Sequence, residues 1–412
     1  MTDGPGRRRR AFVALLPTYL SVFLFVAGGS ALSVVMPVYL SREAKLGPAA
    51  IGVIIGAFAV ASLAARLPAG LTYSARRGAA FLLVGGTCSA AAFALIPFTT
   101  SAVALGALSA LNGVGWSVAT TAQLALLVAR RPTGVTTAEA MGWFSGATAL
   151  GNVAAGVMGG GVADLIGLKQ SFYVLAATPL VGALLMARTT PSPAAAEGVE
   201  APPPRTPVVR SITGLPLAVW VGVLVMFFIN GLNAVTNTFQ PVIALAAGLS
   251  LTQIGALSSV RSWASSSSRF GSGPVFSRID PANLTLPLVV AGSLATCAIP
   301  SVISSFALQI PLFLIAGLSR GLLRVTGSAD AFEGVGDDER RHGVTAALLY
   351  GGLDLGKIAG PVIGGVVAGA FGIATMFRVV PIGFLLLYLA LAIPARRALR
   401  PAARASLAER QV

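Results

Sequence analysis

The residues of this sequence best suited to chemistry are an acid and a base three positions apart in an apolar, glycine-rich stretch. Asp354 and Lys357 lie within residues 350–365, which read YGGLDLGKIAGPVIGG. A charge at bilayer depth costs roughly 2.5 to 3.5 kcal/mol on insertion scales, so such residues usually face a partner or a water-filled cavity. Burial disfavours the ionised carboxylate, whereas a nearby cation favours it. The spacing therefore predicts either a proton-carrying carboxylate or an ion pair along one helix.

Three arginines are the other charges that lie deep in apolar segments. Arg320 and Arg324 are one helical turn apart, and Arg261 stands beside a serine-rich run. Two arginines on one helix face either attract an anion or pair with an acid, for which Asp354 is the candidate. We leave open whether Arg320 and Asp354 pair, and we group Arg261 with Asp354 and Lys357 as candidates for charge pairing or ion coupling.

Four amide side chains recur at spacings of three, four and three, which places them on one helix face. They are Asn230, Asn233, Asn237 and Gln240. Amides buried in lipid without partners would be costly. The pattern therefore indicates either a polar wall that binds a ligand or hydrogen bonds between helices, which contribute about 0.6 to 2 kcal/mol each.

A weaker copy of the 350–365 stretch occurs one half-chain earlier, at residues 145–160. Gly151 matches Gly356 at an offset of 205 residues, and Ala149 and Asn152 stand where the later stretch has its acid and base. Small residues at spacings of three and four let helices approach closely in a bilayer. The difference in charge between the two copies points to the later one as the working site.

The composition excludes a soluble protein. The 412 residues are 55% hydrophobic and 10% charged, whereas soluble domains are about a quarter charged. Because the backbone must satisfy its own hydrogen bonds in lipid, we predict an all-α integral membrane protein. The net charge of +15 is not gathered on a soluble domain, so we expect no nucleic-acid partner. We expect Cys88 and Cys297 to be packing residues, and the single histidine, His342, has no companions spaced for a metal.

Twelve apolar segments are long enough to cross about 30 Å of hydrocarbon as helices. We predict spans at 13–40, 50–72, 79–99, 102–129, 140–166, 171–188, 214–246, 252–276, 284–304, 307–329, 344–370 and 376–395. The first apolar run is too long for a signal peptide, so we expect it to be retained. Most arginines fall in loops on one side, whereas the other side carries only Arg42, Lys45, Lys169 and Arg378. This bias predicts that both termini are cytoplasmic.

The chain divides into two six-span repeats. We expect one half at 1–188, a cytoplasmic linker rich in proline and alanine at 189–213, and a second half at 214–412 with a basic tail. Landmarks recur in order between the halves, among them Arg66 to Gly70 with Arg269 to Gly273, and Asn112 with Arg320. Parallel six-span repeats place a substrate path at the midplane between them.

With these landmarks the sequence resembles transporters of the major facilitator superfamily. The family's loop signature after spans two and eight is matched by Arg66, Gly70, Arg76 and Arg77, and again by Arg269, Gly273 and Arg278. The acidic position of the signature holds Ser74 and Ser277 instead. The resemblance implies a fold of twelve transmembrane helices in two parallel six-helix repeats.

The resemblance also implies roles. Spans one, four, seven and ten would line the cavity, so the candidate substrate-binding residues are Asn112, Trp116, Asn230, Asn233, Asn237, Gln240, Arg320 and Arg324. The two loop signatures supply the gating candidates. We expect a monomeric secondary transporter in a bacterial cytoplasmic membrane, with no catalytic set, no metal and no cofactor. It would move a small organic molecule, as an exporter or proton-coupled antiporter, or alternatively as an importer or exchanger of an organic anion.

Overall fold

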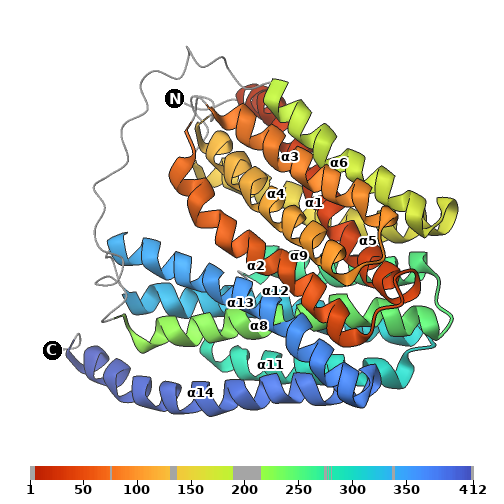
Figure 1. Cartoon of the computed structure of the whole chain (residues 1–412). Coiled ribbons are helices and arrows are strands. Elements are labelled where there is room, and N and C mark those ends of the chain that lie inside the picture. The colour runs from red at the N-terminus through yellow and green to blue at the C-terminus, as the bar shows by residue number, and fades with distance from the viewer. Residues whose placement is uncertain are drawn as a thin grey trace. The chain divides into compact units, whose positions relative to one another are not determined.

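A computed structural model describes residues 5–74, 77–129, 137–188, 215–272, 276, 278–279, 281–335 and 339–409 (Figure 1). Over these ranges the chain forms long α-helices and no strands, which confirms the predicted all-helical membrane fold. The helices are α1 (Pro5–Arg42), α2 (Pro48–Thr72), α3 (Gly78–Leu95), α4 (Ala102–Ala129), α5 (Thr137–Ile166), α6 (Leu168–Arg188), α8 (Leu217–Ala246), α9 (Leu251–Phe270), α11 (Pro281–Ala298), α12 (Phe306–Val335), α13 (Glu339–Phe371) and α14 (Ile373–Glu409). Short 3-10 turns, Ile96–Phe98 and Ile299–Val302, extend α3 and α11.

Eleven of the described helices are long and apolar enough to cross a membrane. The exception is α9, whose 20 residues include Arg261, Arg269 and a run of serines. These polar side chains lower its hydropathy without interrupting the helix. α9 ends at Phe270, before the expected end at 276, whereas α14 continues past the expected end at 395 to Glu409.

The described helices fall into two compact units. The first unit comprises Met1–Pro202 and Ala244–Ser262, and so contains α1 to α6 with the beginning of α9. Within it, α1 packs against α5 and α6, and α4 packs against α2 and α3. The second unit comprises Pro203–Ile243 and Trp263–Val412. In it, α11 packs against α12 and α14, and α13 packs against α14.

In the first unit, glycines bring the backbones of α1 and α5 into direct contact. A Cβ at Gly151 would lie 2.9 Å from the carbonyl oxygen of Phe23, and one at Gly159 would lie 2.9 Å from that of Ala31. No side chain larger than hydrogen fits at these two positions unless the helices separate. The packing of this stretch agrees with the predicted close approach of helices.

The second unit repeats this contact between α8 and α13. A Cβ at Gly352 would lie 2.6 Å from the carbonyl oxygen of Val223, and one at Gly356 would overlap that of Phe227. Gly356 and Phe227 correspond to Gly151 and Phe23 of the first unit at offsets of 205 and 204 residues. The internal duplication seen in the sequence is therefore also a duplication of helix contacts.

The turns between helices repeat as well. Gly167 joins α5 to α6 with φ +97°, and Gly372 joins α13 to α14 with φ +83°. A residue in this left-handed region commonly terminates a helix, and glycine adopts it without steric cost. The same type of connection thus follows the glycine-rich helix in both repeats.

Candidate functional site

The buried charges of the second unit gather where α8, α12 and α13 meet. Asp354 is 7% exposed, and its Oδ1 lies 3.7 Å from Nζ of Lys357 on the same helix. Lys357 is half-buried. The acid and base that the sequence placed three positions apart therefore do approach each other, at the long end of ion-pair range.

Asn230 of α8 connects this pair to its surroundings. Its Nδ2 donates to the carbonyl oxygen of Leu353, at 3.0 Å, and its Oδ1 accepts from Nη2 of Arg320, at 3.5 Å. The first bond is possible because Gly352 and Gly356 allow α13 to approach α8 closely. Asn230 therefore holds the backbone beside Asp354 on one side and a guanidinium on the other.

The remaining amides of α8 have different surroundings. Nε2 of Gln240 donates to Oε1 of Gln309 at 3.2 Å, and Nε2 of Gln309 donates to the carbonyl oxygen of Ile303 at 2.8 Å. Oδ1 of Asn233 is buried and accepts no hydrogen bond from the residues described, and Asn237 is half-buried. Gln240 and Asn230 therefore form the bonds between helices that the sequence offered as one alternative, while Asn233 has acceptor capacity to spare.

A second group of cations lies where α9 and α12 touch. Arg269 donates from Nε to the carbonyl oxygen of Ser265 at 3.1 Å and from Nη2 to Oγ of Ser266 at 3.2 Å. Arg324 lies close enough to act electrostatically on Arg269. The predicted gating residue Arg269 and the predicted substrate-binding residue Arg324 are therefore neighbours.

In the first unit, Trp116 and Asn112 lie on α4. The ring of Trp116 packs at 5.2 Å from that of Phe25 and at 6.3 Å from that of Phe58, between α1 and α2. Asn112 is 5% exposed, and its Oδ1 receives no hydrogen bond within the described part of the chain. Trp116 thus has a clear packing role, and a substrate contact for either residue stays a prediction.

The gating candidates from the two loop signatures differ in their exposure to solvent. Arg66 is half-buried near the end of α2, and Gly70, Arg77 and Arg278 are exposed. Arg261, in α9, is 5% exposed. Arg76 and Gly273 lie outside the described residues, as does the linker 189–213. The gating role of these residues remains a prediction.

One polar contact of the first unit, between Asp164 at the end of α5 and the start of α9, was not predicted from the sequence. Oδ1 of Asp164 accepts from the backbone N–H of Leu251 at 3.2 Å, and Oδ2 accepts from the N–H and the hydroxyl of Thr252, both at 2.7 Å. An acid at this place caps the helix and matches its positive end. Deeper along the same contact, Oγ of Ser259 donates to the carbonyl oxygen of Val153 at 2.5 Å.

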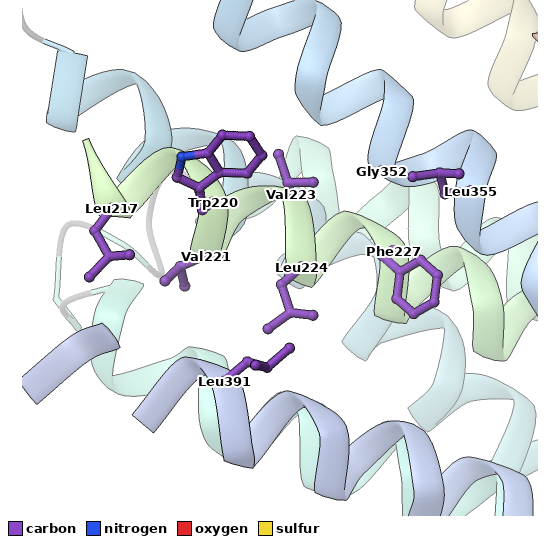
Figure 2. A pocket seen from close by; sticks show the side chains of 9 residues that line it. All are labelled: Leu217, Trp220, Val221, Val223, Leu224, Phe227, Gly352, Leu355 and Leu391. Carbon is purple, nitrogen blue, oxygen red and sulfur yellow. The ribbon is translucent and has the colours of Figure 1, made fainter. Parts of the chain in front are cut away.

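The second unit also contains an apolar pocket of about 400 Å³, shown in Figure 2. It lies between α8 and α14 and is bordered by Gly352 and Leu355 of α13. Its other lining residues are Leu217, Trp220, Val221, Val223, Leu224, Phe227 and Leu391. Asp354 is two positions from Gly352, about 200° around the helix, so these two residues lie on different faces of α13. Such a surface suits lipid tails rather than a polar ligand.

Comparison with known proteins identifies the family. A model described as Major Facilitator Superfamily matches residues 18–344. The structure is similar to a bacterial homolog of the human lysosomal transporter Spinster in an inward-facing, unoccupied conformation, with a TM-score of 0.75 and 16% identity over 96% of this chain and 98% of that one. It is also similar to a mutant of the nucleoside transporter NupG, with a TM-score of 0.76 and 16% identity over 92% of this chain and 99% of that one. No curated protein matches. Identities this low show a shared fold alone.

Proposed function

Because the chain belongs to the Major Facilitator Superfamily, and is thus a multi-pass membrane protein of a secondary-transporter family, we propose that it exports small organic molecules in exchange for protons. In this proposal Asp354 carries the proton. Arg320, Asn230 and Asn233 of the second unit contact the substrate. Direction and coupling are the parts of the proposal that need experiment.

The observation that carries the proposal is the environment of the Asp354 carboxylate. It is 7% exposed in a membrane-spanning helix, and Nζ of Lys357 lies 3.7 Å from its Oδ1. A buried carboxylate is costly when charged and inexpensive when protonated, unless a cation is close. Protonation removes the attraction between Asp354 and Lys357, so proton binding changes the charge on α13 next to the α8 contact. That change gives a proton a means of favouring one conformation over another.

The test uses everted membrane vesicles that contain the full-length protein. Addition of a transported compound should move protons in the wild type, and Asp354→Asn should abolish that movement while substrate binding persists. Glu333→Gln is the matched control, because Glu333 is an exposed carboxylate of the same unit. Proton movement that survives in Asp354→Asn would exclude Asp354 as the carrier.

Export is tested separately, by growth. Cells that express the protein should tolerate at least one class of toxic compound better than cells that express Asp354→Asn. A broad panel without any difference in tolerance would argue against export. This outcome would favour uptake.

Uptake or exchange of an organic anion is the alternative, and the excess of cations favours it. Arg320 and Lys357 both belong to the cluster around Asn230 and Asp354, and Arg324 lies one helical turn beyond Arg320 on α12. An anionic substrate would balance this charge. Arg320→Gln should then weaken anion binding strongly, while unaltered affinity in a well-folded variant would rule out the contact.

We place the protein in the cytoplasmic membrane of a bacterium as a monomer, with both termini inside. The distribution of positive residues between loops supports this orientation. A cysteine placed at Ala195 in the linker should react with a membrane-impermeant reagent only after the cells are opened. Labelling in intact cells would show that the linker lies outside the cell and would contradict the proposed orientation.

A further inference from the structure

Arg269 and Arg324 are brought together by direct contact between α9 and α12. A Cβ at Gly321 would overlap the carbonyl oxygen of Ser265 and the hydroxyl of Ser268, so the two helices touch there without an intervening side chain. Arg324 is about one turn beyond Gly321, and Arg269 is about one turn beyond Ser265. All of these residues belong to the second unit.

Among the described residues, no carboxylate forms an ion pair with either of the two guanidinium groups. Arg269 donates to two neutral acceptors, the carbonyl oxygen of Ser265 at 3.1 Å and the hydroxyl of Ser266 at 3.2 Å, and Tyr350 also lies near it. Among the residues described, the side chain of Arg324 has no hydrogen bond or ion pair. Both arginines are half-buried. Two neighbouring cations that are partly removed from water repel each other and are costly unless an anion joins them.

We propose that Arg269 and Arg324 form a binding site for an oxyanion, a phosphate or carboxylate group. A guanidinium presents its donors as a planar fork that fits two oxygens of such a group, and each arginine has donors left for this purpose. The hydroxyl of Ser266, which accepts a hydrogen bond from Arg269, lies beside the proposed site and carries no charge. The same chemistry is found in a free anion or anionic substrate and in the headgroup of a phospholipid.

This site does not depend on the proposed proton coupling. Among the described residues, neither arginine forms a hydrogen bond or ion pair with Asp354 or Lys357. The binding of an anion can also be measured without transport. A negative result in the proton-movement assay therefore does not contradict the anion site. A negative result in the phosphate-binding assay does not contradict proton coupling.

The first experiment titrates inorganic phosphate into the purified full-length protein in an uncharged detergent and follows thermal unfolding. Phosphate should stabilise the wild type relative to chloride at equal ionic strength. Arg269→Gln and Arg324→Gln should each weaken phosphate binding about 10- to 100-fold, as expected for the loss of a hydrogen-bonded charge. Arg378→Gln, at an exposed arginine of the same unit, is the matched control and should change it less than about twofold.

The second experiment distinguishes a lipid from a free anion. Nanodiscs of phosphatidylcholine with and without phosphatidylglycerol are compared for lipids that remain bound after extraction. If phosphatidylglycerol is retained by the wild type but not by either glutamine variant, the ligand is a headgroup. If phosphate binds in detergent and neither lipid is retained, the ligand is a soluble anion.

A third variant tests the site even if the glutamine variants fold poorly. Arg324→Glu supplies the missing carboxylate from within the chain, so it should unfold at a higher temperature than the wild type in phosphate-free buffer and should no longer respond to phosphate. The proposal is overturned if phosphate and phosphatidylglycerol both bind as well to the glutamine variants as to the wild type, or if neither binds the wild type.

Discussion

The contact between Asp164 and the first turn of α9 allows a local test of the structure. The carboxylate accepts two backbone N–H bonds, from Leu251 and Thr252, and one bond from the Thr252 hydroxyl. Replacement of a helix-capping acid by alanine costs about 0.5 to 2 kcal/mol. Because Asp164 is exposed, water screens its charge, and we expect Asp164→Ala to cost about 1 to 2 kcal/mol rather than the sum of three charged bonds.

The assay is hydrogen exchange of the full-length protein, read from peptides that cover residues 250–256. A loss of about 1 to 2 kcal/mol should speed exchange of the Leu251 and Thr252 amides roughly 5- to 30-fold. Asp164→Asn keeps one acceptor oxygen and should give a smaller increase. Glu43→Ala is the control, since Glu43 is also a surface acid of the first unit but pairs with Lys169.

A double-mutant cycle with Thr252→Val tests whether the two side chains act together. The two changes should be non-additive by about 0.5 kcal/mol or more, because both remove the same 2.7 Å bond. Unchanged exchange of the two amides in Asp164→Ala would refute the capping geometry. Additive effects would show that the hydroxyl bond contributes nothing.

Three further predictions concern packing. Gly156→Leu should prevent folding, because a Cβ at this position overlaps the carbonyl oxygen of Gly255. Gly106→Leu should be tolerated, because nothing lies within 4 Å of a Cβ at that position. The measurement is the yield of monodisperse protein. Gln309→Leu should lower the free energy of unfolding by about 1 to 3 kcal/mol, because Nε2 of buried Gln240 loses its acceptor. The double variant with Gln240→Leu should recover part of this loss, because the unpaired amide is then removed. Trp116→Ala should cost about 3 to 5 kcal/mol and Trp116→Phe much less, as measured by reversible unfolding in mixed micelles, because the ring packs on Phe25 and Phe58.

The helices and the close contact at the glycine-rich stretches could be predicted from the sequence. The reason is that both depend on local properties, namely long apolar runs and small residues at fixed spacing. The end of a helix is less predictable where the sequence stays compatible with helix, as in α14 beyond 395. The span predicted at 252–276 forms as α9, although the arginines and serines of that helix lower its hydropathy.

The candidate site was only partly predictable. Sequence spacing put Asn230 and Gln240 on one face of α8, but could not show that Asn230 bonds to Leu353 of α13 while Gln240 bonds to Gln309 of α12. These partners are far away in sequence, and nothing in the spacing of α8 specifies them. The role of Asp164 was missed for a similar reason, since a single acid at the end of a span looks like any residue at the membrane surface.

The duplicated contact between glycine and phenylalanine backbone has an evolutionary consequence. Gly151 on Phe23 and Gly356 on Phe227 form the same helix pairing in both copies, as expected if the pairing is older than the duplication. The neighbouring positions, Ala149 and Asn152 against Asp354 and Lys357, diverged afterwards. The two repeats therefore share the helix contact and differ in the charges beside it, so the ionic character of a repeat can change without a change in its helix packing.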